Sequence, residues 1–181
     1  MPVKSGLKTA FPIILLTIVV AISVTALTFT DRATRGKIEA QKEQEIQNML
    51  SEMFPNMSEY DFENEIYTIY TDGDKVGYAF LAVGKGYGGD IDILVGLEDE
   101  MTVKGVTIIS QTETPGLGSR IAESSFTDRF KGQSIEDVAL TRDGGKIDAI
   151  TSSTISSRAV VDAVRTTAME KAKVLKGDEG G

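Results

Sequence analysis

The chain has 181 residues, long enough for one domain with a hydrophobic core and an accessory segment. Its 19 basic and 27 acidic side chains give a formal net charge of −8, which argues against nucleic acid as a partner because no basic stripe is present to release phosphate counterions. The absence of cysteine and histidine excludes disulfides, iron–sulfur clusters, haem attachment, Ser-His-Asp or Cys-His catalysis and the usual zinc sites.

A short N-terminal tail, residues 1–8, precedes a predicted membrane-spanning helix at residues 9–30. The 22 residues between Lys8 and Asp31 carry no charge, and as a helix they would reach about 33 Å, enough to cross a bilayer. Pro12 would lie in the first turn of this span, where its missing N–H does little harm. A cleaved signal peptide is the alternative, but the apolar run is long for one and no A-x-A cleavage motif follows it.

The charges that flank this segment leave its orientation open. Two lysines precede it, whereas four basic residues follow it: Arg32, Arg35, Lys37 and Lys42. A count of positive charges therefore does not favour a cytoplasmic N-terminus, and the rule is weak where a long domain must cross the membrane.

Residues 31–54 are predicted to form a stalk helix that leads from the membrane into the domain. Apolar residues recur near helical spacing up to Met53, and Pro55 then stops the helix.

The next segments are predicted to form two β-hairpins. Residues 66–71 and 76–83 are rich in β-branched and aromatic residues and flank the turn sequence "DGDK". Residues 90–97 and 102–110 have the same character around "EDEM".

The rest of the chain is predicted to be mainly helical. A loop, "QTETPGLGS", leads to a helix near 119–130; residues 146–150 form one short strand, and residues 156–173 form an amphipathic helix. Antiparallel strands with helices before and after them indicate an α+β domain over residues 55–175, followed by a flexible tail at 176–181.

Two glycine-bearing segments are candidates for ligand contacts. In "GKGYGG" (84–89), the glycines allow close backbone approach to a flat or charged ligand, and Tyr87 could stack or hydrogen-bond. Taken alone, this segment is better explained as a flexible loop between strands. In "TETPGLGS" (112–119), Pro115 and Gly116 predict a type II turn.

A cluster of hydroxyl side chains precedes the last helix. Five of the six residues from Thr151 to Ser156 carry a hydroxyl, although a helix cap needs only one, such as Ser156 or Thr154. A helix N-terminus also offers unpaired N–H groups to an anion. Because the apolar face of the final helix would dock it on the domain, the cluster is a plausible phosphate site.

The two motifs in this order resemble a known family. "ETPGLG" at 113–118, followed by "DAITSSTISSRAV" from Asp148, resembles the FMN-binding domain shared by the G subunit of Rnf-type ion-translocating oxidoreductases and the C subunit of sodium-translocating NADH:quinone reductases. The single span and "GKGYGGDIDILVG" fit the G subunit better. The resemblance covers essentially the whole chain.

The resemblance implies that FMN is covalently attached. In the family a flavin transferase uses FAD and magnesium to join FMN, through its phosphate, to the last threonine of a pattern close to D-x-x-[ST]-G-A-T. Asp148, Thr151 and the acceptor Thr154 match this pattern, whereas Ser152 and Ser153 stand where glycine and alanine are usual. A phosphoester also agrees with the lack of the histidine and cysteine side chains that usually hold a flavin ring.

The resemblance also implies where the flavin ring would lie. The expected wall near the isoalloxazine ring is Glu113, Thr114, Gly116 and Leu117, and the expected opposite side is Gly86, Tyr87 and Gly88.

The function implied is that of a single-pass membrane subunit whose FMN domain faces the extracytoplasmic side. Its complex would oxidise reduced ferredoxin, pass electrons to NAD or another acceptor, and move Na⁺ or H⁺. The expected partners are multi-span and Fe–S subunits and a flavin transferase; no metal and no independent catalysis are expected. A freestanding membrane-anchored flavin electron-transfer protein and a non-redox module for another phosphorylated ligand remain alternatives.

Overall fold

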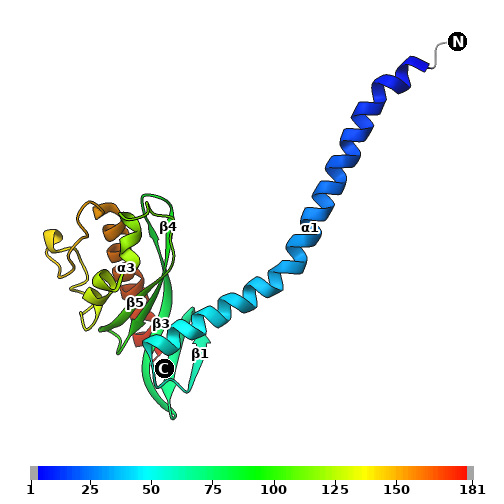
Figure 1. Cartoon of the computed structure of the whole chain (residues 1–181). Coiled ribbons are helices and arrows are strands. Elements are labelled where there is room, and N and C mark those ends of the chain that lie inside the picture. Colours follow the sequence, from blue (N-terminus) through cyan, green and yellow to red (C-terminus); the bar gives the residue numbers. More distant parts are fainter. Residues whose placement is uncertain (1–3, 179–181) are drawn as a thin grey trace. The chain divides into compact units, whose positions relative to one another are not determined.

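The computed structural model describes residues 4–178, and its contacts divide the chain into two units, Met1–Gln47 and Asn48–Gly181. The predicted span and stalk form one continuous helix, α1, from Lys4 to Met53 (Figure 1). Because α1 begins at Lys4, Pro12 lies inside the helix and not in its first turn, which corrects the prediction. The predicted tails fall partly outside the described residues, at 1–3 and 179–181.

One stretch of α1, Phe11–Phe29, is long and apolar enough to cross a membrane by length and composition, and none of it is buried in the protein. Three of its hydroxyls are satisfied by the helix itself. Thr17, Thr25 and Thr28 donate hydrogen bonds to the carbonyl oxygens four residues earlier, at 2.9, 2.7 and 2.6 Å. These bonds remove the main cost of placing a hydroxyl in an apolar phase.

The domain is built on a five-stranded antiparallel sheet in which strand order follows chain order. Its strands are β1 (Glu59–Glu63), β2 (Ile66–Thr71), β3 (Asp74–Lys85), β4 (Asp90–Leu97) and β5 (Val103–Ser110). The two predicted hairpins, β2–β3 and β4–β5, are therefore confirmed, as is the α+β class. Strand β1 was not predicted.

Local chemistry closes the hairpin turns. Asp72 and Gly73, between β2 and β3, have φ values of 53° and 91°, the positive values that a two-residue I′ turn requires. Between β4 and β5, Oδ1 of Asp99 accepts hydrogen bonds from the N–H groups of Met101 and Thr102 at 2.7 and 2.8 Å. The Met101 bond is the main cause that holds the pKa of Asp99 below its ordinary value.

The main core lies between one face of the sheet and helix α3 (Thr154–Asp178). Residues Val160, Val161 and Val164 of α3 are fully buried. The helix approaches β3 closely, because a Cβ at Gly84 would lie 2.6 Å from the carbonyl oxygen of Ala159. This contact fixes the N-terminal half of α3, and with it the hydroxyl cluster, against the sheet.

The opposite face of the sheet is partly covered by the last turn of α1 and the residue after it. Leu50 and Phe54 are buried there. A Cβ at Gly96 would lie 2.1 Å from Sδ of Met53, and one at Gly77 would lie 2.7 Å from Cε1 of Phe54. Glycines on the strands therefore make room for these side chains.

Two predicted elements in the last third of the chain were wrong. The helix expected near 119–130 is three short turns, η1 (Gly118–Ala122), α2 (Ser124–Thr127) and η2 (Asp128–Phe130), because Glu123 adopts an extended conformation with ψ of 143°. The strand expected at 146–150 is a loop with an isolated bridge between Leu140 and Ile147. Its buried residues, Ile147 and Ile150, are three apart, whereas one strand face needs a spacing of two.

Candidate functional site

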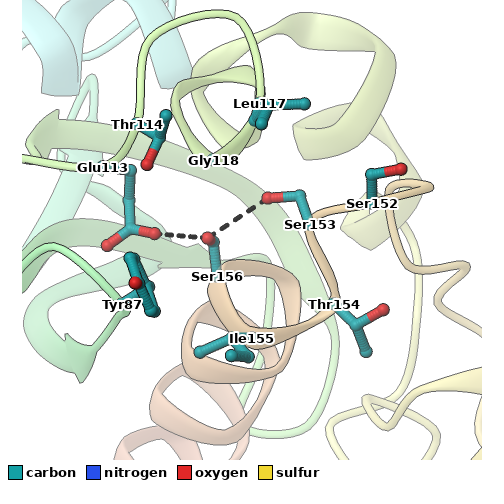
Figure 2. Close-up of a pocket in the computed structure, with 10 residues that line it drawn as sticks. All are labelled: Tyr87, Glu113, Thr114, Leu117, Gly118, Ser152, Ser153, Thr154, Ile155 and Ser156. Carbon is teal, nitrogen blue, oxygen red and sulfur yellow. Dashed lines mark hydrogen bonds between the residues drawn. The ribbon is translucent and has the colours of Figure 1, made fainter.

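A cavity of about 440 Å³ lies at the N-terminal end of α3 (Figure 2). Three segments form its walls: the β3–β4 loop, the segment after β5 and the start of α3. The lining residues are Tyr87, Glu113, Thr114, Leu117, Gly118, Ser152, Ser153, Thr154, Ile155 and Ser156.

Thr154 is the first residue of α3, so the helix begins two residues earlier than predicted. The carbonyl of Ser153 accepts the first helical hydrogen bond, from the N–H of Ser157 at 3.0 Å, which places Ser153 at the N-cap position. Ser156, predicted as a possible cap, is therefore in the first turn. The Thr154 side chain is half-buried, and within residues 4–178 no group hydrogen-bonds its hydroxyl.

The other hydroxyls of this region have different partners. Ser157 donates to the carbonyl of Ser153 at 2.9 Å and accepts from the N–H of Ile150 at 3.0 Å. Ser153 donates to the Ser156 hydroxyl at 3.2 Å. These three serines are buried, whereas Thr151 and Ser152 are exposed. The buried serines hold the loop onto the helix, whereas Thr154 lines the cavity and its hydroxyl has no hydrogen-bond partner within residues 4–178.

Ser152 has a strained backbone. Its φ is +67°, in the left-handed region that glycine occupies at no steric cost and other L-residues seldom adopt. This is the position at which the resembling pattern has glycine. The local geometry therefore explains that preference without reference to any ligand.

Glu113 links two walls of the cavity. Its side chain is only 5 % exposed. Oε1 accepts a hydrogen bond from the N–H of Gly88 at 2.7 Å, and Oε2 accepts one from the hydroxyl of Ser156. Figure 2 shows the chain of bonds from Glu113 through Ser156 to Ser153.

The predicted turn at Pro115–Gly116 is confirmed. Gly116 has a φ of +73°, and the N–H of Leu117 donates to the carbonyl of Thr114 at 3.1 Å, as in a type II turn. The turn places Leu117, which is 47 % exposed, at the cavity. Tyr87 and Ile155, at 75 % and 59 % exposed, line it from the other two segments.

The cavity brings together seven of the twelve residues predicted at the cofactor site: Tyr87, Glu113, Thr114, Leu117, Ser152, Ser153 and Thr154. The other five do not line it: Gly86, Gly88, Gly116, Asp148 and Thr151. Asp148 is exposed, and its backbone carbonyl accepts a hydrogen bond from the Arg129 guanidinium.

Sequence reasoning did not place three lining residues at the site: Gly118, Ile155 and Ser156. Each has a sequence signal that could have suggested it. Gly118 is the second glycine of the "PGLG" turn, Ile155 is the one apolar residue within the hydroxyl cluster, and Ser156 was interpreted as a helix cap.

Comparisons with known proteins agree with this arrangement. The model of the FMN-binding domain family matches residues 86–168. The G subunit of the ion-translocating oxidoreductase complex of Aliivibrio fischeri strain ES114 is 33% identical, over 80% of this chain and 82% of its own. The G subunit of the Na(+)-translocating ferredoxin:NAD(+) oxidoreductase complex of Acetobacterium woodii is 30% identical, over 83% of this chain and 86% of its own.

One solved structure has a similar fold. The C subunit of the Na(+)-translocating NADH-quinone reductase from Parabacteroides distasonis aligns with a TM-score of 0.50 and 24% identity. The alignment covers 59% of this chain and 61% of that one, less than two thirds of its length.

These findings confirm the resemblance identified from the two motifs. Two relatives are at least 30% identical over more than four fifths of their own length, so the chain belongs to the family of the G subunits of ion-translocating oxidoreductase complexes.

Proposed function

We propose that this chain is a membrane-anchored flavoprotein subunit that carries FMN as a phosphoester on Thr154 and relays electrons within an ion-translocating complex. One observation carries the proposal. In a chain whose residues 86–168 match the FMN-binding domain, Thr154 lines a cavity at the start of a docked helix, and its hydroxyl has no hydrogen-bond partner within residues 4–178. Bound FMN would supply transfer of one or two electrons.

The start of α3 suits a phosphate. The first N–H groups of a helix have no intrahelical acceptor and carry a partial positive charge. A phosphate joined to Thr154, the first residue of α3, would lie beside these groups and could accept hydrogen bonds from them. The buried valines of α3 hold this helix end in place.

The cavity also suits a flat, largely apolar ring. Its volume, about 440 Å³, is within the range of roughly 300–1,000 Å³ typical of small-molecule sites. The side chains of Tyr87, Leu117 and Ile155 are 47–75 % exposed, and a ring placed between them would cover apolar surface that now faces solvent. Their role would be to bind and orient the ring and to exclude water from it.

In the proposed complex, Phe11–Phe29 anchors the chain in the membrane and the FMN domain faces the extracytoplasmic side. The complex couples oxidation of ferredoxin, with NAD or another acceptor, to movement of Na⁺ or H⁺. Multi-span and Fe–S subunits are its partners, and a flavin transferase that recognises Asp148 and Thr151 attaches the FMN. The names of the relatives support the ion-translocating complex, and the apolar stretch of α1 supports the membrane anchor.

Attachment is tested by producing the full chain together with a flavin transferase. We expect fluorescence on a denaturing gel and a mass increase of one FMN less one water. Thr154→Ala should abolish both signals, whereas Thr166→Ala, the same change at an exposed position of the same helix, should retain them. A Thr154→Ala protein that stays fluorescent would disprove the attachment site.

Orientation is tested separately, because the chain has no native cysteine. A cysteine introduced at Ser125, an exposed position in the domain, should react with an impermeant maleimide in intact spheroplasts. A cysteine introduced at Ser5 should react only after the membrane is broken. The reverse pattern would place the domain in the cytoplasm.

A further inference from the structure

We infer that the buried Glu113 carboxylate, through its hydrogen bonds to Gly88 and Ser156, fixes the Tyr87 wall of the cavity relative to Thr154. The cofactor site would then have its shape before any cofactor is attached. We call Glu113, Gly88 and Ser156 the Glu113 clamp. The inference rests on the proposed function only in naming FMN on Thr154 as the ligand. Glu113 acts through its two partners and is a positioning residue.

The clamp joins parts of the chain that are far apart in sequence. Gly88 is 25 residues before Glu113, and Ser156 is 43 residues after it. Because the carboxylate is only 5 % exposed, water could not replace either partner without opening the structure. Removing the carboxylate would leave the O–H of buried Ser156 and the partly buried N–H of Gly88 without their acceptor, and each loss costs more than a surface hydrogen bond.

Three glycines of the two sequence motifs are packed around this clamp. A Cβ at Gly86 would lie 2.2 Å from Oε1 of Glu113. One at Gly118 would lie 2.7 Å from Oε2 of Glu113 and 2.9 Å from Oγ of Ser156. One at Gly88 would lie 2.1 Å from the carbonyl oxygen of Thr112.

These three positions need glycine because there is no space for a Cβ, and not because of their backbone conformation. Gly86, Gly88 and Gly118 have no positive φ. Gly116 is the opposite case, because its φ is +73° and a Cβ there would meet nothing within 4 Å. The two glycines of "PGLG" therefore have different roles: the first forms the turn, and the second makes room for the Glu113 clamp.

The clamp determines where Tyr87 lies relative to the attachment point. Tyr87 is between Gly86, whose N–H bonds the carbonyl of Gly89 at 2.9 Å, and Gly88, which is held by Glu113. On the other side, Ser156 is two residues after Thr154 in the same helical turn. Loss of the carboxylate should let the Tyr87 loop separate from the start of α3 while the sheet remains folded.

The test measures amide hydrogen exchange of Gly88 by NMR in the full chain in detergent, without flavin. In Glu113→Ala and Gly118→Ala, the Gly88 amide should exchange about tenfold faster or more, the factor expected for losing a hydrogen bond to a charged group. The amide of Ala168 in α3 should keep its protection, which separates opening of the clamp from global unfolding. Gly116→Ala is the matched control and should leave Gly88 protected.

Glu113→Gln tests whether the side chain acts through its two hydrogen bonds and not through its charge. Its amide oxygen can still accept from Gly88, and its NH₂ can donate to Ser156, so Gly88 should stay protected. In flavin-loaded protein, the visible circular dichroism of the flavin should change in Glu113→Ala and Gly118→Ala and be retained in Glu113→Gln.

Two results would overturn the inference: unchanged Gly88 exchange in both Glu113→Ala and Gly118→Ala, or a Glu113→Gln protein that behaves like Glu113→Ala. The exchange measurement needs no flavin, so it stands even if Thr154 carries none. A failure of the proposed attachment site is therefore distinguishable from a failure of the clamp.

Discussion

Two carboxylates in this domain each accept two hydrogen bonds, yet they act at different levels of structure. Asp99 is exposed, and its partners are two and three residues away, so it closes a single turn. Glu113 is buried, and its partners are 25 and 43 residues away, so it joins three segments of the tertiary fold. The number of hydrogen bonds therefore says little about their effect; burial and separation in sequence decide it.

The largest difference should be in stability. We expect Glu113→Ala to lower the free energy of unfolding by about 2–4 kcal/mol, because the buried Ser156 hydroxyl and the partly buried N–H of Gly88 both lose a charged acceptor. Asp99→Ala should cost less than about 1 kcal/mol, because water replaces the exposed carboxylate. Denaturant unfolding followed by tyrosine fluorescence measures both, since all five tyrosines are between residues 60 and 87. Equal losses in the two variants would contradict the comparison.

Ser156→Ala removes one arm of the clamp. It should cost about 1–3 kcal/mol, because Oε2 of Glu113 is then left without a donor in a buried site. Ser125→Ala is the control at an exposed serine and should change the free energy of unfolding by less than about 0.5 kcal/mol. The same unfolding measurement applies, and a loss no larger than that of the control would show that the Ser156 arm is dispensable.

Ser152→Gly, next to the clamp, should increase stability. Glycine relieves the cost of a φ of +67°, and the expected gain is up to about 1 kcal/mol after the greater entropy of the unfolded chain is subtracted. Thr151→Gly is the matched control, because Thr151 has no positive φ, and it should give no gain. A loss of stability in Ser152→Gly would mean that the serine side chain itself contributes to the loop.

The smallest expected effect is the pH dependence of the Asp99 turn. Hydrogen bonds from Met101 and Thr102 lower the pKa of Asp99 below its ordinary value of 3.8. Its contribution to stability is therefore present above that value and is lost as pH falls through the lowered pKa. The contribution is less than about 1 kcal/mol, because the group is exposed and screened. Asp99→Asn should remove this increment of acid sensitivity, and unfolding curves between pH 5 and roughly pH 2.5 would measure it.

Much of the sheet was predictable from sequence, because β2, β3, β4 and β5 alternate or cluster apolar residues. Strand β1 was not, since it is only five residues long, four of them are exposed, and just two aromatic residues, Tyr60 and Phe62, alternate with its acidic ones. Its turn to β2 is Asn64–Glu65, with φ values of 52° and 60°, which lacks the glycine that usually marks such a turn. Tertiary contacts stabilise it: Nζ of Lys171 bonds the carbonyl of Asn64 and the carboxylate of Glu65.

The candidate site was predictable as a set of segments but not as a set of contacts. The motifs identified the loop at 84–89, the turn at 113–118 and the cluster at 151–156, and these are the segments that line the cavity. The partnership of Glu113 with Gly88 and Ser156 could not be inferred, because it depends on how α3 packs on β3. Gly86, in the loop interpreted as allowing close approach to a ligand, instead makes room for the Glu113 side chain.

The strand order of the sheet has a consequence for the timing of cofactor attachment. Each strand pairs with its neighbour in sequence, so hairpins can form one after another as the chain is made, without long loops to close. The cavity is different, because residues 87, 113 and 156 must come together and helix α3 follows all the strands of the domain in the chain. The proposed flavin attachment, if it needs the formed cavity, would therefore follow synthesis of the whole domain, which would make it a late step in biogenesis.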